Sequence, residues 1–97
     1  MMKHSEMRAQ ALENLETRAA FNDMKTEFGL LRQMLDARAR KSLNQAEVAS
    51  LMGTHAPAIT RLESSLANGR HSPSIATLQK YAKAVGCTLE INLVQRP

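Results

Sequence analysis

The side chains that could support catalytic or metal chemistry are few and scattered along this chain. His4, His55 and His71 lie far apart, and Cys87 has no companion at the spacing of a zinc ligand. No glycine-rich loop of the kind that cradles phosphate is present, and acidic residues on predicted helices are expected to face solvent. We therefore expect no enzyme activity, no metal and no cofactor, and expect the chain to act through a binding surface.

The stretch around His55, QAEVASLMGTHAPAITRLE at residues 45–63, predicts two short helices joined by a tight turn. Gly53 lies where a helix end favours positive φ, and Pro57 fits the first turn of the second helix because its missing N–H is not needed there. Spacings of three and four predict the inward residues, which are Val48, Ala49, Leu51, Met52, Ile59 and Leu62. A helix, a glycine turn and a second helix form the helix-turn-helix layout.

This stretch resembles the helix-turn-helix of the lambda-repressor-like (Xre) family. The family's characteristic positions are occupied by Gln45, Ala49, Gly53, Ile59 and Glu63, and the resemblance covers roughly residues 30–86. It implies an all-α bundle that binds a palindromic DNA operator as a homodimer. The flanking LLRQMLDARAR and the tail GRHSPSIATLQKYAKAVGCTLEINLV also resemble HigA-type antitoxins. That resemblance implies autoregulation of an operon and a partner toxin that cleaves mRNA and has a RelE-like fold.

The family pattern also implies which residues read bases. Its second helix enters the major groove, and the first two turns of that helix hold Ala56, Pro57, Thr60 and Arg61 in this chain. Arg61 can bond guanine in bidentate fashion, whereas Ala56 and Pro57 offer apolar contact, as to a thymine methyl. The alternatives for Arg61 are a phosphate contact or a free surface position.

Other residues are expected to contact the DNA backbone or flanking bases. Gln45 matches a family position that contacts phosphate or a flanking base, and His55 stands where family members usually have Ser or Thr. Phosphate contacts are further expected from Asn44, Ser64, Arg70 and His71. The alternative for Arg70 and His71 is an ordinary polar loop.

The resemblance assigns a structural role to one pair of charged residues. In the family, an arginine seven positions before the motif glutamine pairs with the glutamate that closes the second helix. Arg38 and Glu63 match this spacing. We expect their ion pair to tie the first core helix to the recognition helix.

Charge is unevenly distributed along the chain. The formal net charge is +4, yet residues 1–27 hold four basic against five acidic residues, so the remaining residues carry +5. This excess accompanies the helix-turn-helix, where a phosphate backbone would be met. The single cysteine, and the lack of a signal-peptide or membrane-spanning apolar run, lead us to expect a cytoplasmic protein without membrane contact.

The residues before the helix-turn-helix predict further helices. Residues 6–20 contain good helix formers, and Phe21, Met24, Phe28, Leu31 and Leu35 recur at helical spacings. The stripe from Phe28 to Leu35 is expected to pack on the domain core. Residues 12–24 lie outside the common family core, so they face either that core or a partner such as the toxin.

A cap at Ser74 predicts a helix over residues 75–85, with Ile75, Leu78, Ala82 and Val85 inward. After it, Cys87, Leu89, Ile91 and Leu93 alternate with polar residues and predict a strand. Because a lone strand edge invites pairing, we expect Leu89, Ile91 and Leu93 to belong to an antiparallel dimer strand. The strand lying on its own domain or pairing with the toxin are the alternatives.

The sequence thus predicts an all-α helix-turn-helix bundle with an N-terminal helical extension (1–27), a DNA-binding domain (28–86) and a C-terminal strand (87–97). The predicted function is that of a DNA-binding repressor and type II antitoxin. A stand-alone Xre repressor without a toxin is the alternative. A helical protein-interaction module without DNA binding is a third interpretation, against which the +5 charge and Arg61 argue.

Overall fold

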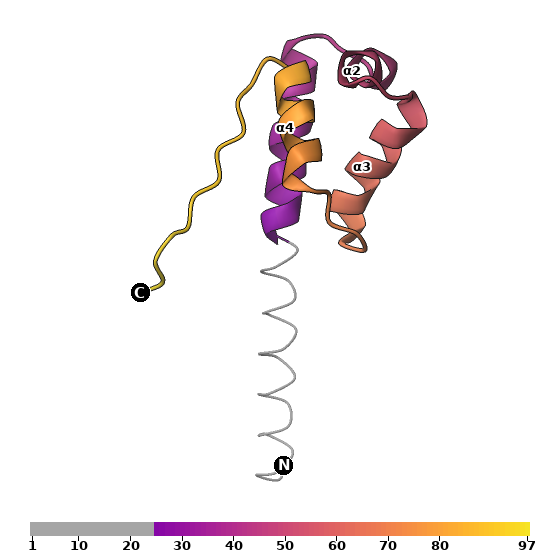
Figure 1. Cartoon of the computed structure of the whole chain (residues 1–97). Helices are drawn as coiled ribbons and strands as arrows, with labels where there is room; N and C mark the ends of the chain where they lie inside the picture. Colours follow the sequence, from indigo (N-terminus) through magenta and orange to yellow (C-terminus); the bar gives the residue numbers. More distant parts are fainter. Residues whose placement is uncertain (1–24) are drawn as a thin grey trace, which may run out of the picture.

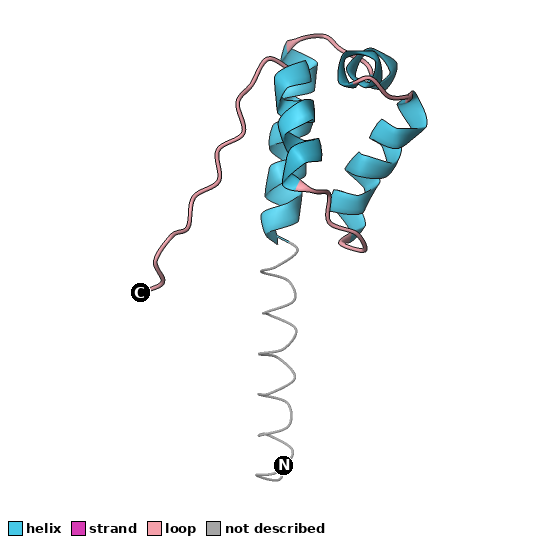
Figure 2. Cartoon of the chain, viewed as in Figure 1, coloured by secondary structure: helices cyan, strands magenta, loops and turns pink. Residues whose placement is uncertain are grey.

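The computed structural model describes residues 25–97, and all regular structure in this part of the chain is helical (Figures 1 and 2). A helix over residues 25–40 comes first, followed by α2 (Gln45–Met52), α3 (Ala56–Asn68) and α4 (Ile75–Ala84). Figure 1 shows α2 at the top of the domain, α3 descending on one side, and α4 beside the helix over residues 25–40. The predicted all-α class is confirmed for the described residues.

Local capping sets the ends of these helices. Asn44 and Glu47 form a capping box at the start of α2, which satisfies backbone N–H groups that lack partners inside the helix. Gly53 ends α2 at φ 74°, and Gly69 ends α3 at φ 68°, both in the left-handed region where a side chain would be strained. Ser74 caps α4 by accepting from the backbone N–H of Thr77. The predicted helix-turn-helix boundaries are confirmed.

The core lies where α2, α3 and α4 meet the helix over residues 25–40. Val48 and Ile59 are fully enclosed, and Ala49 is small enough to let the helices cross closely. The buried apolar residues are Met34, Ala37, Val48, Ala49, Ile59, Leu62, Leu66, Tyr81 and Val85. Burial of this aliphatic set removes apolar surface from water and stabilises the bundle.

Three residues predicted to face inward are instead exposed. Leu51 is 63% exposed, Ile75 56% and Phe28 44%. Ile75 is the first residue of α4 and lies at its exposed start. Leu51 lies off the buried face of α2, since Met52, one residue further along, still packs against the core. On the first helix the buried face passes through Met34 and Ala37 rather than through the predicted stripe, although Leu31 still packs against the core.

The predicted C-terminal strand is not seen. Residues 87–97 form an extended tail without regular structure, and within the described chain no backbone hydrogen bond is made by residues 88–97. A strand requires a hydrogen-bonded neighbour, and residues 25–97 offer no second strand to pair with. Ile91 and Leu93 therefore remain in solvent, whereas Leu89 is half-buried.

The predictions for the N-terminal extension are not tested by the structure, which describes residues 25–97. The helix predicted over residues 6–20 and the apolar residues Leu12, Leu15, Phe21 and Met24 lie outside them. No helix among residues 25–97 is long and apolar enough to cross a membrane.

Candidate nucleic-acid interface

The outer face of α3 carries the side chains expected to enter the major groove. Pro57, Thr60, Arg61 and Ser64 are all exposed, whereas Ile59 and Leu62 on the opposite face are buried. Because α3 turns through one revolution every 3.6 residues, the exposed group forms one continuous surface. Ala56, at the start of α3, is half-buried. The helix therefore presents a polar face with one free guanidinium, fixed to the domain by its apolar face.

The start of α2 lies beside this face. Gln45 is half-buried and its side-chain oxygen accepts a hydrogen bond of 2.9 Å from the Thr60 hydroxyl. Asn44 is exposed, but its side-chain oxygen already accepts from the backbone N–H of Glu47. Gln45 and Thr60 are thus brought together, while only the amide N–H groups of Asn44 remain free to meet a phosphate.

The remaining candidates lie at the two ends of α3. His55 is the exposed N-cap residue and makes no side-chain capping bond. Arg70 and His71 are exposed in the loop after α3, roughly 20 Å from its first turn at 1.5 Å per residue. Arg70 and His71 therefore do not share one base-reading site with the first turn of α3, and any contact they make lies further along the DNA backbone.

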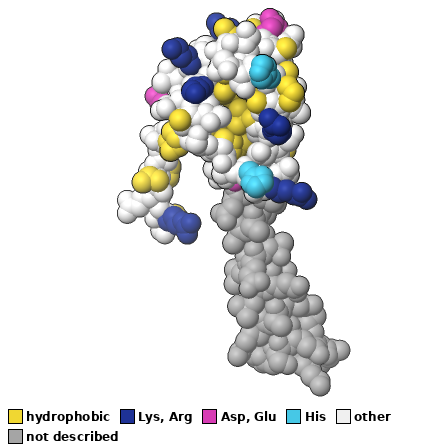
Figure 3. Space-filling model, turned by 45° about the vertical axis from the view of Figure 1, so that its right-hand side comes forward, with side chains coloured by type: hydrophobic (Ala, Val, Ile, Leu, Met, Phe, Trp, Pro, Cys, Tyr) yellow, Lys and Arg dark blue, Asp and Glu magenta, His cyan; other side chains and the backbone are white. Residues whose placement is uncertain are grey.

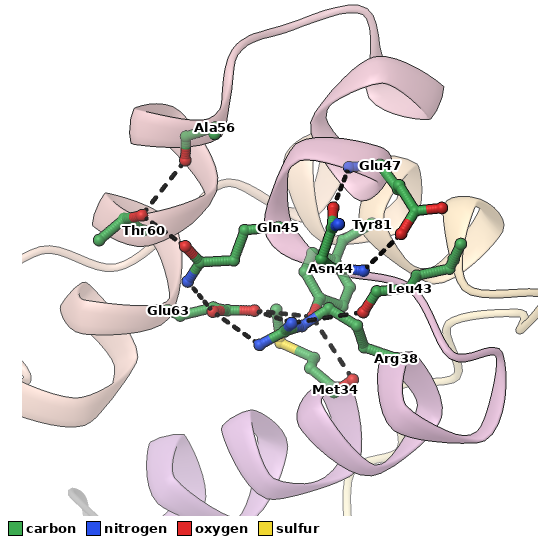
Figure 4. A network of polar contacts seen from close by, with 10 residues as sticks. All are labelled: Met34, Arg38, Leu43, Asn44, Gln45, Glu47, Ala56, Thr60, Glu63 and Tyr81. Atoms are coloured by element: carbon green, nitrogen blue, oxygen red, sulfur yellow. Dashed lines mark hydrogen bonds and ion pairs between the residues drawn. The ribbon is translucent and has the colours of Figure 1, made fainter.

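Behind the exposed face, a polar cluster is organised around Glu63 (Figure 4). Arg38 Nε lies 3.2 Å from Glu63 Oε2, and Arg38 Nη2 donates to Oε1 at 3.4 Å. The Nε–H group makes no well-aligned hydrogen bond, so this contact is chiefly an ion pair. Gln45 donates to Oε1 at 2.8 Å and the Tyr81 hydroxyl donates to Oε2 at 2.9 Å. One carboxylate thereby links the helix over residues 25–40 with α2, α3 and α4.

Tyr81 is the participant that the sequence analysis missed. It is 1% exposed, and its hydroxyl lies 3.4 Å from the backbone carbonyl oxygen of Met34 on the helix over residues 25–40. Its position, three residues after Leu78 and four before Val85, matches the apolar stripe of α4, so the spacing signal was available. What the spacing could not show was the buried carboxylate that receives its hydroxyl.

The environment of Tyr81 predicts a dependence of stability on alkaline pH. Burial, and then the hydrogen bond to Glu63, raise the pKa of Tyr81 from 10.0 to about 12. Because the folded pKa is the higher one, the neutral phenol stabilises the fold fully below pH 10, and this contribution is lost as pH rises toward about 12. Denaturant unfolding across this range should show a steeper loss of stability for the parent than for Tyr81→Phe, which lacks the titrating group. Equal slopes would contradict this role of Tyr81.

The surface around this site is mildly basic. Figure 3 shows Lys and Arg side chains spread over this face of the domain, with few acidic ones among them. Glu63, the one acidic residue of α3, is only 8% exposed and paired, so the outer face of α3 carries Arg61 without a competing negative charge. Among residues 25–97, no cluster of His, Cys, Asp and Glu could hold a metal ion.

A glycine-linked pair of helices, with the second one exposed and polar on its outer face, defines a helix-turn-helix DNA-binding domain. Comparison with protein families matches residues 34–92 to the family described as Helix-turn-helix. The chain belongs to this Xre (lambda-repressor-like) family of DNA-binding transcription regulators. Comparisons with curated proteins and with solved structures give no match.

Proposed function

We propose that the protein is a sequence-specific transcriptional repressor that acts in the cytoplasm on a palindromic operator. The observation that carries this proposal is the outer face of α3, where Thr60 and Arg61 are exposed at positions expected to reach base edges while Glu63 is buried. Binding by such a face releases counterions, so affinity should fall steeply with salt concentration. A helical module that binds only proteins would show no such dependence on DNA and salt.

We further propose that the repressor is a homodimer joined through its C-terminal tail. Leu93 is 101% exposed and Ile91 60%, an apolar face that nothing among the described residues covers. Figure 3 shows apolar side chains exposed along the far part of the tail, whereas Leu89 nearer the domain is half-buried. The same tail in a second copy offers both the missing backbone partners and an apolar face of equal size.

An antitoxin role is the finer part of the proposal, and it rests on the resemblance of residues 30–40 and 69–94 to HigA-type sequences. In this role the protein would also bind a RelE-like toxin and autoregulate its operon. The candidate toxin contact is residues 1–27, which carry Leu12, Leu15, Phe21 and Met24. The stand-alone repressor remains the alternative. Co-expression with the product of the adjacent reading frame tests the choice: rescue of growth supports the antitoxin, and a non-toxic neighbour contradicts it.

The DNA-reading role of α3 is tested by replacing Arg61. Arg61→Ala should weaken binding to the selected operator by about 1–3 kcal/mol and relax the preference at one base position, because a bidentate guanine contact is lost. Fluorescence anisotropy with a panel of single-base operator variants measures both effects. An unchanged affinity would show that Arg61 does not enter the groove.

Two matched variants separate base contact from simple charge. Arg61→Lys keeps the positive charge but lacks the planar fork, so it should retain the salt dependence and lose the base preference. Arg32→Ala removes an exposed arginine from the helix over residues 25–40 rather than from α3, and should leave the base preference unchanged. If Arg61→Lys kept the full preference, the contact would be to phosphate.

A further inference from the structure

The hydroxyl of Thr60 lies at the end of a chain of hydrogen bonds that begins at the buried carboxylate of Glu63 (Figure 4). Gln45 Nε2 donates to Glu63 Oε1 at 2.8 Å, and Thr60 Oγ1 donates to Gln45 Oε1 at 2.9 Å. Glu63 is buried and Thr60 is exposed, so this chain joins the core to the outer face of α3. Whether the buried group of Glu63 donates or accepts can therefore determine whether the exposed Thr60 hydroxyl donates or accepts.

The direction of these bonds follows from the proton count. Both oxygens of Glu63 face donors, which are the Arg38 guanidinium, the Tyr81 hydroxyl and the Gln45 amide. A carboxylate in this setting accepts only, so Gln45 must turn its NH₂ group toward it. The carbonyl oxygen of the Gln45 amide then faces Thr60. That oxygen carries no proton, and the Thr60 hydroxyl must supply the one in this hydrogen bond.

The Thr60 hydroxyl proton also has a second acceptor within the protein. The backbone carbonyl of Ala56 lies 3.3 Å from Thr60 Oγ1, one helical turn away. A hydroxyl has a single proton and two lone pairs. With Gln45 and Ala56 both competing for that proton, donation to DNA would leave an acceptor on the protein without its partner. The group that Thr60 offers to the outer face is therefore a lone pair.

We propose that Thr60 reads DNA as a hydrogen-bond acceptor and selects a base edge that carries an amino group. In the major groove such groups are N6 of adenine and N4 of cytosine, whereas O6 of guanine and O4 of thymine are acceptors and are rejected. This inference rests on the proposed DNA-binding function and specifies it. Since each base pair has one amino group and one oxygen at these positions, Thr60 distinguishes A·T from T·A and C·G from G·C.

The test uses the full chain and an operator selected from a randomised duplex library. Competition binding is then measured for duplexes in which each base pair is reversed in turn. At the position read by Thr60, reversal should weaken binding by roughly 5–10-fold, less than for a bidentate contact because a single hydrogen bond is exchanged. Thr60→Val has nearly the same shape without the hydroxyl and should lose this preference. Thr60→Ser keeps the hydroxyl and its proton and should retain it.

Glu63→Gln provides an independent arm, because one carboxylate oxygen becomes an NH₂ group. The Gln45 amide can then reverse and donate to Thr60, which frees the Thr60 proton, so the preference for amino edges should weaken. Because this variant can also lower stability, the Thr60→Val and Thr60→Ser pair carries the decision. The inference is overturned if Thr60→Val keeps every orientation preference of the parent, or if the base that faces Thr60 in the preferred orientation is guanine or thymine. Absence of salt-dependent DNA binding by the parent would instead remove the proposed function, and this inference with it.

Discussion

Glu63→Ala should lower the free energy of unfolding by about 3–5 kcal/mol, because it leaves the Arg38 guanidinium partly buried without its counter-charge. The Arg38 side chain is 22% exposed and that of Glu63 10%, so water can replace little of what the carboxylate supplies. The Tyr81 hydroxyl and the Gln45 amide lose their acceptor in the same variant. Urea unfolding followed by circular dichroism measures the loss, and an unchanged midpoint would show that the pair contributes nothing to stability.

Two further variants isolate the ion pair from the loss of a side chain. Ser64→Ala changes the adjacent, exposed residue of α3 and should alter stability by less than about 0.5 kcal/mol. Arg38→Ala combined with Glu63→Ala leaves neither charge unpaired, so the double variant should be less destabilised than the sum of the two single ones. Strict additivity in this cycle would contradict a direct interaction between Arg38 and Glu63.

Truncation after Gly86 should yield a monomer whose affinity for a two-half-site operator is lower by roughly 100-fold or more, because the second half-site is no longer bound intramolecularly. The core residues end at Val85, so the truncated domain retains its buried set. Analytical ultracentrifugation reports the oligomeric state, and binding to a single half-site reports whether the domain is still folded. A tight dimer after truncation would refute dimerisation through the tail.

Point variants in the full chain test whether dimerisation depends on the apolar face of the tail or only on the tail being present. Ile91→Lys combined with Leu93→Lys places charge on the exposed apolar face and should dissociate the dimer. Asn92→Lys adds charge on the opposite face of the extended chain, since alternate side chains point to opposite sides, and should leave the dimer intact. Equal effects of the two changes would show that charge, not the apolar face, governs association.

The helix ends of the DNA-binding domain follow from the amino-acid sequence alone, because the signals that set them are local. Asn44 and Ser74 cap their helices with hydrogen bonds to N–H groups three residues away. Gly53 and Gly69 adopt a backbone conformation that glycine alone tolerates without strain. Arg61 could be placed on an outward face for the same reason, since the period of 3.6 fixes its angle relative to the apolar residues of α3.

The packing of the helices, in contrast, selects which apolar residues are buried and which polar groups meet. Periodicity defines an apolar face within a helix, but which residues of that face are buried depends on how the other helices pack against it, and Leu51 and Ile75 stay exposed. The hydrogen bonds from Tyr81 to Glu63 and from Thr60 to Gln45 join residues distant in sequence, so no local pattern could reveal them. The tail has the alternating apolar and polar residues of a strand but makes no strand hydrogen bonds. Such bonds need a second extended segment, which residues 25–97 do not contain.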